Sequence, residues 1–401
     1  MHPLSHERIW ELARSVHPFA VEARRHLHRN PELSFEEKET SEYLAAQLKA
    51  MGLIFQPGIG GYGIKVVFQG SQPGPTIALR ADIDALPIQE ETGLPYASVK
   101  PGIMHACGHD VHTATLLATA RALKAVAADL PGQVVLIFQP GEEKAPGGAS
   151  LMIKDGVLEN PHVDAIFGLH VFPAMPAGVL AFGAGPRMAA PDEFDVVIRG
   201  RGGHGAYPHL CIDPIMVACQ CITLLQQVVA RNVSPFDQAV ITVGAIHGGS
   251  ARNVIPDEVT FGGTVRTMNP EVRSRMPARI EQVVRGVCEA AGASCEIHFD
   301  TGYPMLINDS ACTDLARSAA LAVLPAEKVL EMPATMGGED FAFYLEKVPG
   351  SFARLGATAP GAKGAPGLHS SRLMIDEECM AVGVAYYLSL VQQFFHSRGL
   401  H

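Results

Sequence analysis

The chain has 401 residues, of which 47% are hydrophobic and 18% charged, and its net charge is −10 at pH 7. This length predicts two folded domains, and the acidic balance argues against a nucleic-acid partner. The residues from Met1 to Arg8 lack the features of a signal peptide, and no uncharged apolar run approaches the length of a membrane span. The eight cysteines follow no disulfide-framework spacing. We therefore expect a cytoplasmic protein without a membrane partner.

The first part of the chain alternates between helix and strand patterns. Apolar residues that recur every three or four positions predict helices over residues 7–28 and 36–51. Apolar and β-branched runs predict strands at residues 63–69, 76–80, 134–138 and 164–169. The continuous apolar character of the last two runs is typical of strands buried on both faces. With a further helix over 113–126, these elements predict an α/β fold with a helix-covered, mostly parallel sheet.

The pattern changes near residues 183–186. An alternation typical of half-exposed strands follows, interrupted by two helical segments, in elements predicted at residues 193–199, 213–231, 239–246, 258–266, 270–291 and 294–299. This order predicts a small antiparallel sheet with two helices on one face. The α/β pattern then returns. We therefore expect a catalytic domain formed by residues 1–186 and 300–401, with an α+β domain at 187–299 inserted over its active site.

One eight-residue stretch concentrates metal-binding side chains. Between His105 and His112 it contains Cys107, His109 and Asp110, and thiolate and imidazole are preferred ligands of zinc and its first-row neighbours. A lone buried cysteine or histidine is usually structural. Several such residues in one glycine-punctuated loop, between a strand and a helix, predict a metal site.

Acidic pairs follow two of the predicted strands. Asp82 and Asp84 leave the end of one strand on the same side, where they would bind metal or orient histidines. The adjacent Glu142 and Glu143 follow another strand, and such a pair can provide one metal ligand and one general base. The alternative without a function is a surface Asp pair for Asp82 and Asp84, and an exposed acidic turn for Glu142 and Glu143.

Two further histidines complete a candidate ligand set. One ends the strand predicted at 164–169, and the other follows a Gly- and Pro-rich segment at 356–367 that we expect to be a mobile loop near the site. The candidate ligands are then Cys107, His109, Glu143, His170 and His369. Five ligands are too many for one tetrahedral zinc with an open position, so two metal ions bridged by a thiolate or a water fit better.

The inserted domain offers three candidate site residues, one catalytic and two that would bind substrate. His204 lies in a Gly-rich turn, from which an imidazole can donate a hydrogen bond to a developing oxyanion. Asn253 adds an amide, and Arg266 is of the type that binds a carboxylate in a bidentate manner. A salt bridge on the strand face is the plain alternative for Arg266.

Together these residues resemble the di-metal amidohydrolases of the aminoacylase and carboxypeptidase kind, in particular the branch of hippurate hydrolase, auxin-conjugate hydrolases and N-acetyl-diaminopimelate deacetylases. The motifs that carry the resemblance run in order over nearly the whole chain, at residues 26–33, 80–87, 104–110, 139–143, 203–209, 253–257 and 368–370.

This resemblance implies a catalytic domain interrupted by a lid domain through which subunits form a homodimer or homotetramer. It implies that two divalent ions per subunit, manganese or zinc in preference to nickel or cobalt, bind the five ligands. Glu142 would be the general base, assisted by Asp82 or Asp84. His204 would reach the site of a neighbouring subunit, and Asn253 and Arg266 would hold the substrate carboxylate.

The predicted activity is hydrolysis of the amide bond of N-acyl amino acids of the hippurate, N-acetyl or indoleacetyl type. The nearest alternative is a carboxypeptidase or dipeptidase that uses the same site on short peptides. Two readings from other classes are a metal-binding scaffold that has lost catalysis and an enzyme with Cys107 as nucleophile, activated by His105 or His109.

Overall fold

The computed structural model describes residues 4–359, 361 and 364–400, and the chain folds into two compact units. The host unit comprises Met1–Gly185, Ile307–Pro333 and Asp340–His401, and the inserted unit comprises Pro186–Leu306 and Ala334–Glu339. Each unit has its own hydrophobic core. The inserted unit extends past residue 299, where the sequence analysis expected it to end, and it takes in a second, separate segment of the chain.

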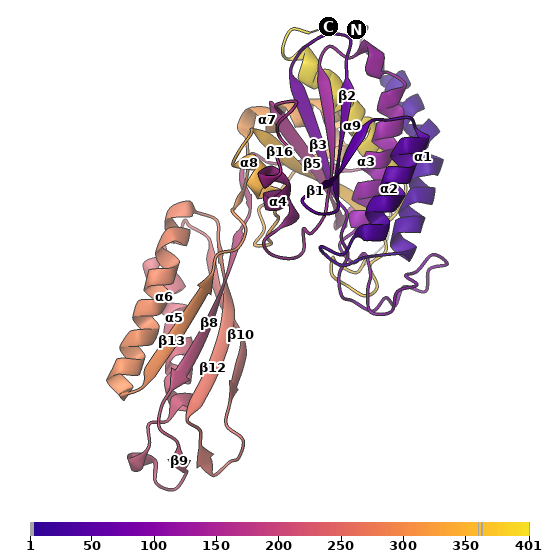
Figure 1. Ribbon diagram of the computed structural model, residues 1–401. Helices are drawn as coiled ribbons and strands as arrows, with labels where there is room; N and C mark the ends of the chain where they lie inside the picture. The colour runs from indigo at the N-terminus through magenta and orange to yellow at the C-terminus, as the bar shows by residue number, and fades with distance from the viewer. Residues whose placement is uncertain (1–3, 360, 362–363, 401) are drawn as a thin grey trace. The chain divides into compact units, whose positions relative to one another are not determined.

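The host unit is built on an eight-stranded sheet with the order β1-β2-β4-β3-β5-β16-β6-β15 (Figure 1). Its strands are β1 (Phe55–Ile59), β2 (Gly63–Gln69), β3 (Thr76–Asp82), β4 (Gln133–Gln139), β5 (Ala165–Pro176), β6 (Leu180–Phe182), β15 (Val329–Glu331) and β16 (Gly350–Thr358). Parallel pairing joins the four central strands, in the order β4-β3-β5-β16. Every residue of β3 is buried, as a strand covered on both faces requires. The predicted α/β fold with a mostly parallel sheet is confirmed.

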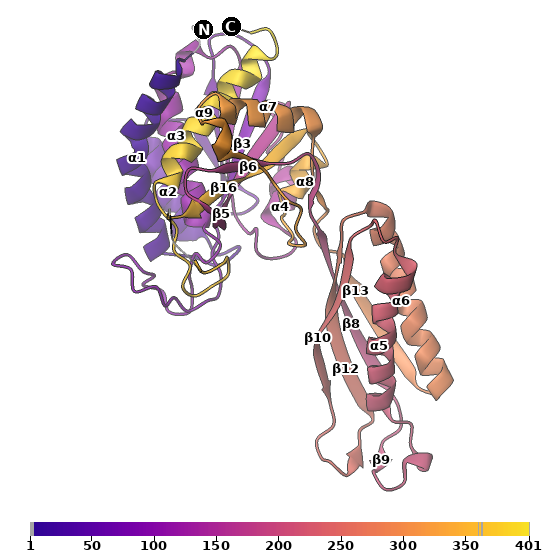
Figure 2. The same ribbon diagram turned by 180° about the vertical axis from the view of Figure 1, so that it is seen from behind.

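Helices cover both faces of this sheet (Figures 1 and 2). They are α1 (His6–Arg29), α2 (Lys38–Ala50), α3 (His109–Lys124), α4 (Gly148–Lys154), α7 (Ser310–Leu321), α8 (Ala342–Leu345) and α9 (Cys379–His396). α1, α3 and α9 pack against one another in one layer, and α7 packs against α9. α4 and α8 contact each other on the opposite face.

Two predicted boundaries near the candidate site were wrong. The helix predicted over 113–126 begins at His109, because Gly108 adopts a left-handed conformation with φ of +83° and turns the chain directly into α3. The strand predicted over 164–169 continues to Pro176, because β16 pairs with it as far as Thr358. A pairing partner that lies so far along the chain leaves no local signal in the sequence.

The inserted unit is a four-stranded antiparallel sheet with the order β10-β12-β8-β13, and two helices lie on one face of it (Figure 1). Its elements are β8 (Ala190–Arg199), β9 (Gly203–His204), α5 (Pro214–Asn232), β10 (Ala239–Gly248), β11 (Val254–Ile255), β12 (Glu258–Thr267), α6 (Pro270–Ala291) and β13 (Ser294–Asp300). Short strands β7 (Gly185–Met188) and β14 (Leu306–Asn308) lie where the chain passes from one unit to the other.

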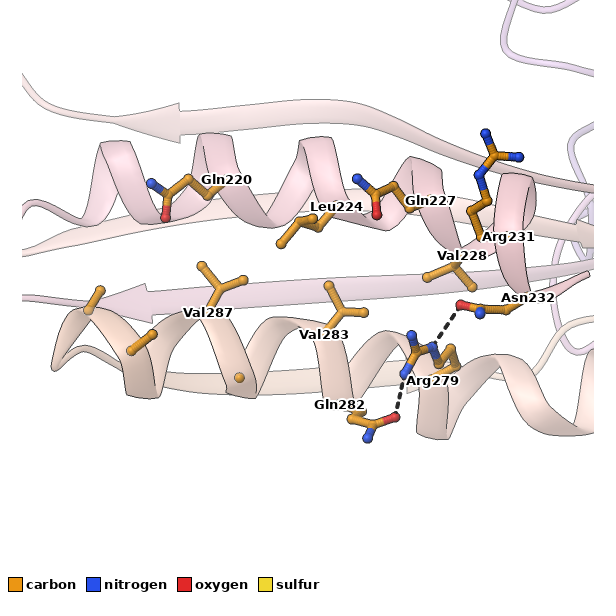
Figure 3. Close-up of a pocket in the computed structure, with 13 residues that line it drawn as sticks. Gln220, Leu224, Gln227, Val228, Arg231, Asn232, Arg279, Gln282, Val283 and Val287 are labelled. Atoms are coloured by element: carbon orange, nitrogen blue, oxygen red, sulfur yellow. Dashed lines mark hydrogen bonds between the residues drawn. The ribbon is translucent and has the colours of Figure 1, made fainter.

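Helix α5 is long and apolar enough, by composition alone, to cross a membrane, with a mean hydropathy of 1.2. In the structure Val217 and Leu225, on one side of α5, pack into the core of the inserted unit. Gln220 and Gln227 line a groove of about 780 Å³ between α5 and α6 (Figure 3). Leu224 lines the same groove and Met216 is exposed, so the outer side of α5 mixes polar and apolar side chains.

Candidate metal centre

Neighbouring parallel strands bring the candidate residues of the host unit together. Asp82 is the last residue of β3, and the turn at residues 140–143 follows β4, which pairs with β3. His170 lies within β5, on the other side of β3, and not at the end of its strand as predicted. Cys107 precedes α3, and His109 is the first residue of that helix. The site therefore lies at the carboxyl ends of β3 and β4, as expected for an α/β fold.

The ligand atoms of the candidate residues form overlapping groups whose members lie within 4.8 Å of one another. One group contains Cys107, His109 and His170, and a second contains Cys107, Glu143 and His369. Because Cys107 belongs to both groups, a single thiolate would lie between two adjacent ion positions. The five predicted ligands are thus side by side in the host unit.

The environment of His109 fits a divalent cation. Its buried Nε2 atom has no hydrogen-bond partner among the described residues. Carboxylate oxygens of Asp82, Glu142 and Glu143 face this atom at 3.7, 4.0 and 4.0 Å, respectively. These distances are too long for hydrogen bonds. Several acidic groups around an imidazole lone pair leave a position whose charge balance calls for a cation.

Asp84 orients His109 from the opposite side of the ring. The Nδ1 atom of His109 lies 3.0 Å from the Asp84 carbonyl oxygen and 3.1 Å from its Oδ1, so Nδ1 carries the proton and Nε2 presents its lone pair. Burial opposes protonation of the ring, but the charges of Asp82 and Asp84 raise the pKa of His109 to about 10. Without a cation, a proton on His109 would balance these carboxylates.

Asp82 is held by a buried network. The Arg80 guanidinium donates to Asp82 Oδ2 over 2.7 Å and to Asp340 Oδ1 over 2.8 Å. His112 accepts the Val171 N–H at Nε2 over 2.9 Å, so its Nδ1–H donates to Asp82 Oδ1 over 2.6 Å. Burial alone would raise the pKa of Asp82, but the positive charges of His109 and Arg80 hold it well below its ordinary value. The carboxylate therefore stays ionised.

Cys107 needs a cation to act as a thiolate. Burial, followed by the charges of Glu143 and Glu142, raises the pKa of the Cys107 thiol well above its ordinary value. Its Sγ lies 3.4 Å from Nε2 of His170, whose Nδ1–H donates to the Val171 carbonyl over 2.7 Å. The lone pair of His170 therefore faces the sulfur. Coordination to a metal ion deprotonates such a thiol outright.

His369 completes the set from the second segment of the host unit. Its backbone has φ of +62°, and its N–H donates to the Ala106 carbonyl over 2.7 Å. Its Nε2 lies 3.2 Å from Oε1 of Glu143, and its side chain is half exposed. The preceding segment, predicted as a loop over 356–367, is a strand as far as Thr358, and residues 360, 362 and 363 lie outside the described part of the chain. His105 belongs to none of the metal-binding groups among the described residues.

The inserted unit brings two of its three candidate residues together. His204 on β9 pairs with Val254 on β11, and the N–H of Gly205 donates to the Asn253 carbonyl over 2.8 Å, so His204 and Asn253 share one exposed tip. Arg266 lies near the far end of β12, about 26 Å along the strand from Glu258, the residue that adjoins this tip. Asn253 and Arg266 are therefore not neighbours within one chain.

Comparison with known proteins identifies the family. The model of peptidase family M20/M25/M40 matches residues 78–393. The chain belongs to this family. It is 46% identical to an N-acetyl-L-cysteine deacetylase of Bacillus subtilis, with 91% of this chain and 85% of the relative covered. It is 37% identical to thermostable carboxypeptidase 1 of Saccharolobus solfataricus, with 97% and 98% covered.

A solved structure of a Bacillus subtilis protein, described as a dinuclear metal-binding peptidase of the M20 family, is also similar to this chain. It superposes with a TM-score of 0.82 at 37% identity and covers 96% of this chain and 99% of its own. The resemblance inferred from the motifs is thereby confirmed, and the family is one of hydrolases.

Several residues that support the site were not among the predicted site residues. Arg80 and His112 hold Asp82, and Asp340 accepts a hydrogen bond from Arg80. Ser34 donates to Asp84, and Glu37 accepts the N–H of Gly141. Arg80 and His112 lie inside motifs that the sequence analysis singled out, so a search for partners of Asp82 could have found them. Asp340 lies 260 residues from Arg80, and no spacing rule in the sequence connects the two.

Proposed function

We propose that this chain hydrolyses the amide bond of N-acyl amino acids with two divalent cations bound between its five candidate ligands. The observation that carries the proposal is the pair of ligand groups that share Cys107, with the carboxylate of Glu142 beside them. The deacetylase relative acts on an N-acyl amino acid by its name, which supports this substrate class. We further propose a cytoplasmic setting, in line with the eight cysteines, all of which are free.

The ligands would be divided between two ions. Cys107, His109 and His170 would hold one, and Cys107, Glu143 and His369 the other. We propose manganese or zinc ahead of nickel or cobalt, as the family resemblance implies; the thiolate and imidazole donors suit zinc, and the carboxylate donors suit manganese. When bound, such cations supply Lewis acidity that polarises a carbonyl group and lowers the pKa of a water molecule.

The remaining residues would position and move protons. Glu142, beside Glu143 but outside the two ligand groups that share Cys107, would take the proton of the attacking water and return it to the leaving amine. Asp84 would keep His109 in the tautomer that presents Nε2. Asp82 faces Nε2 itself at 3.7 Å, so of the two aspartates it is the one that would contribute charge next to the cations.

The inserted unit would complete the site of a neighbouring subunit in a homodimer or homotetramer. His204 would donate a hydrogen bond to the oxyanion of the tetrahedral intermediate, and Asn253 and Arg266 would hold the substrate carboxylate. Because Asn253 and Arg266 lie at opposite ends of β12, one substrate molecule would contact both only if they came from different subunits. This separation supports a site shared between two chains.

A carboxypeptidase or dipeptidase is the second candidate function, favoured by the carboxypeptidase relative. The test is to load the protein with Mn²⁺ or Zn²⁺ and measure kcat/KM on N-benzoyl-, N-acetyl- and indoleacetyl-amino acids and on unmodified dipeptides. We expect higher values on the N-acyl amino acids. Higher values on dipeptides would favour the peptidase, and activity that survives exhaustive chelation but not thiol alkylation would favour Cys107 as a nucleophile.

A further inference from the structure

The turn that carries Glu142 is fastened on both sides by buried carboxylates. The N–H of Gly141 donates to Oε1 of Glu37 over 2.7 Å. The N–H of Glu143 donates to Oδ2 of Asp84 over 2.9 Å. The backbone before and after Glu142 is therefore anchored to two separate acidic side chains, one from the segment at residues 32–37 and one from the end of β3.

Burial of the Glu37 carboxylate is only partly compensated, because one of its two oxygens has no hydrogen-bond partner among the described residues. The side chain is fully inaccessible, and the oxygen without a partner in the described part of the chain is Oε2. Although Glu37 is the residue that precedes helix α2, its side chain makes no capping hydrogen bond to that helix. An acid buried in this way normally destabilises a protein, so a role at the turn explains its presence better than a role in folding.

The same segment also fixes Gly141 by contact. Gly141 has φ of +64°, and a Cβ atom at this position would lie 2.2 Å from Cε1 of the Phe35 ring. Phe35 itself has φ of +67°, a conformation that an aromatic residue adopts only when its surroundings impose it. The Phe35 ring thus packs against the backbone of Gly141, one residue before Glu142.

We propose that Glu37 is a positioning residue for the acidic turn. It acts through the N–H of Gly141, and it holds the backbone so that Glu142 and Glu143 point to their separate tasks. This inference rests on the proposed function in one respect, because the effect on turnover assumes that Glu142 is the general base. The effect on the turn itself does not depend on that assumption.

The experiment compares three variants of the full-length protein. Glu37→Ala removes the acceptor, and Glu37→Gln keeps an oxygen that can accept the Gly141 N–H. Glu32→Ala is the matched control. Glu32 is also buried and in the same segment, but it accepts the N–H groups of Glu39 and Thr40 at the start of α2 over 3.1 and 2.7 Å, so its loss tests stability without touching the turn.

Three quantities are measured for each variant: amide hydrogen exchange of peptides covering residues 139–146 in the metal-free protein, the Kd for Zn²⁺ by chelator competition, and kcat and KM on an N-acyl amino acid. In Glu37→Ala we expect faster exchange in the turn, a higher Kd because Glu143 shares the turn, and a kcat that is about ten- to a hundredfold lower with little change in KM. Glu37→Gln should return all three toward the wild-type values.

Glu32→Ala should lower thermal stability and leave the exchange of the turn and kcat unchanged. The inference is overturned if Glu37→Ala keeps wild-type exchange in the turn, or if Glu32→Ala affects the turn and kcat equally. It is also overturned if Glu37→Gln folds but behaves like Glu37→Ala. Should the wild-type protein prove inactive on every substrate, the proposed function fails, but the exchange and Zn²⁺ measurements still decide the role of Glu37.

Discussion

The candidate residues of the host unit and those of the inserted unit are held in contrasting ways. Asp82 and His109 are fully buried, Cys107 is 7% exposed, and each has a partner that fixes its orientation. His204 and Asn253, in contrast, lie exposed on a tip formed by turns and two short strands. One set is preorganised within its own unit, and the other is presented to solvent.

This difference shows which interactions each unit can complete alone. Buried carboxylates and lone pairs that face one another are balanced by a cation, and all the candidate metal ligands lie in the host unit. An exposed imidazole gains little from its surroundings in water, where a hydrogen bond has a small net value. The tip of the inserted unit therefore needs another surface to become part of a site.

The largest effect on kcat is expected at the adjacent Glu142 and Glu143 of the host unit, to which we assign proton transfer and metal binding, respectively. Glu142→Gln should lower kcat by about two to four orders of magnitude, the usual scale for a general base, with both metal ions retained. Glu143→Gln should lose metal as well, since Glu143 belongs to the ligand group of Cys107 and His369. Metal analysis and steady-state kinetics on both variants provide the measurement. Equal loss of metal in the two would contradict the division of roles.

The next effect concerns the exposed tip. Removal of one oxyanion donor typically costs about two to three orders of magnitude in kcat, so His204→Ala should be nearly inactive although it keeps its metal. A wild-type metal content separates this effect from damage to the host unit. If His204→Ala retains full activity, the tip has no part in catalysis. The candidate residues of the two units then differ only in how deeply they are buried.

Mixing two inactive variants tests whether the tip serves a neighbouring subunit. In a mixed dimer of Glu142→Gln and His204→Ala, a shared site would combine the intact Glu142 of one chain with the intact His204 of the other, and activity would return at one of the two sites. If each chain uses its own tip, every site keeps one defect. Native mass spectrometry confirms that mixed dimers have formed, and continued inactivity then refutes the shared site.

Metal removal should affect the two units unequally. A cation present at about 100 times its Kd stabilises the folded state by about 2.7 kcal/mol, and all five candidate ligands belong to the host unit. Chelation should therefore lower the unfolding temperature and speed amide exchange around Cys107 and Glu143, whereas exchange in α5 and α6 stays unchanged. A similar loss of protection in both units would show that the ions also organise the inserted unit.

The sequence predicted elements best where their signals are local. Helix α6 was predicted at its observed bounds, because Asn269 caps it, Pro270 begins it and Gly292 ends it in a left-handed conformation. β5 was predicted too short because its last residues are strand only through their pairing with β16. The short strands β1, β6 and β15 were not predicted at all, because they carry little periodicity of their own.

The candidate ligands stand out in the sequence for the same reason, whereas some of the residues that support them, such as Asp340 and Glu37, do not. Three of the candidate ligands, Cys107, His109 and Glu143, lie in short motifs rich in metal-binding side chains. The residues that hold them are ordinary polar types whose partners lie far along the chain, as Glu37 is from Gly141, at a separation of 104 residues. Only the folded structure brings such pairs together.

The smallest effect is expected at Arg266, the one candidate residue of the inserted unit that is half-buried. It makes no ion pair with any residue in the described part of the chain, which leaves its guanidinium available to a substrate carboxylate. Arg266→Gln should raise KM for an N-acyl amino acid about tenfold with kcat retained, because a charge-assisted hydrogen bond is worth about 1.5 kcal/mol and a contact remote from the scissile bond binds ground state and transition state alike. The matched control is the corresponding carboxamide substrate, whose kcat/KM should be the same in wild type and variant. An equal loss on both substrates would mean that Arg266 maintains the sheet and does not bind the carboxylate.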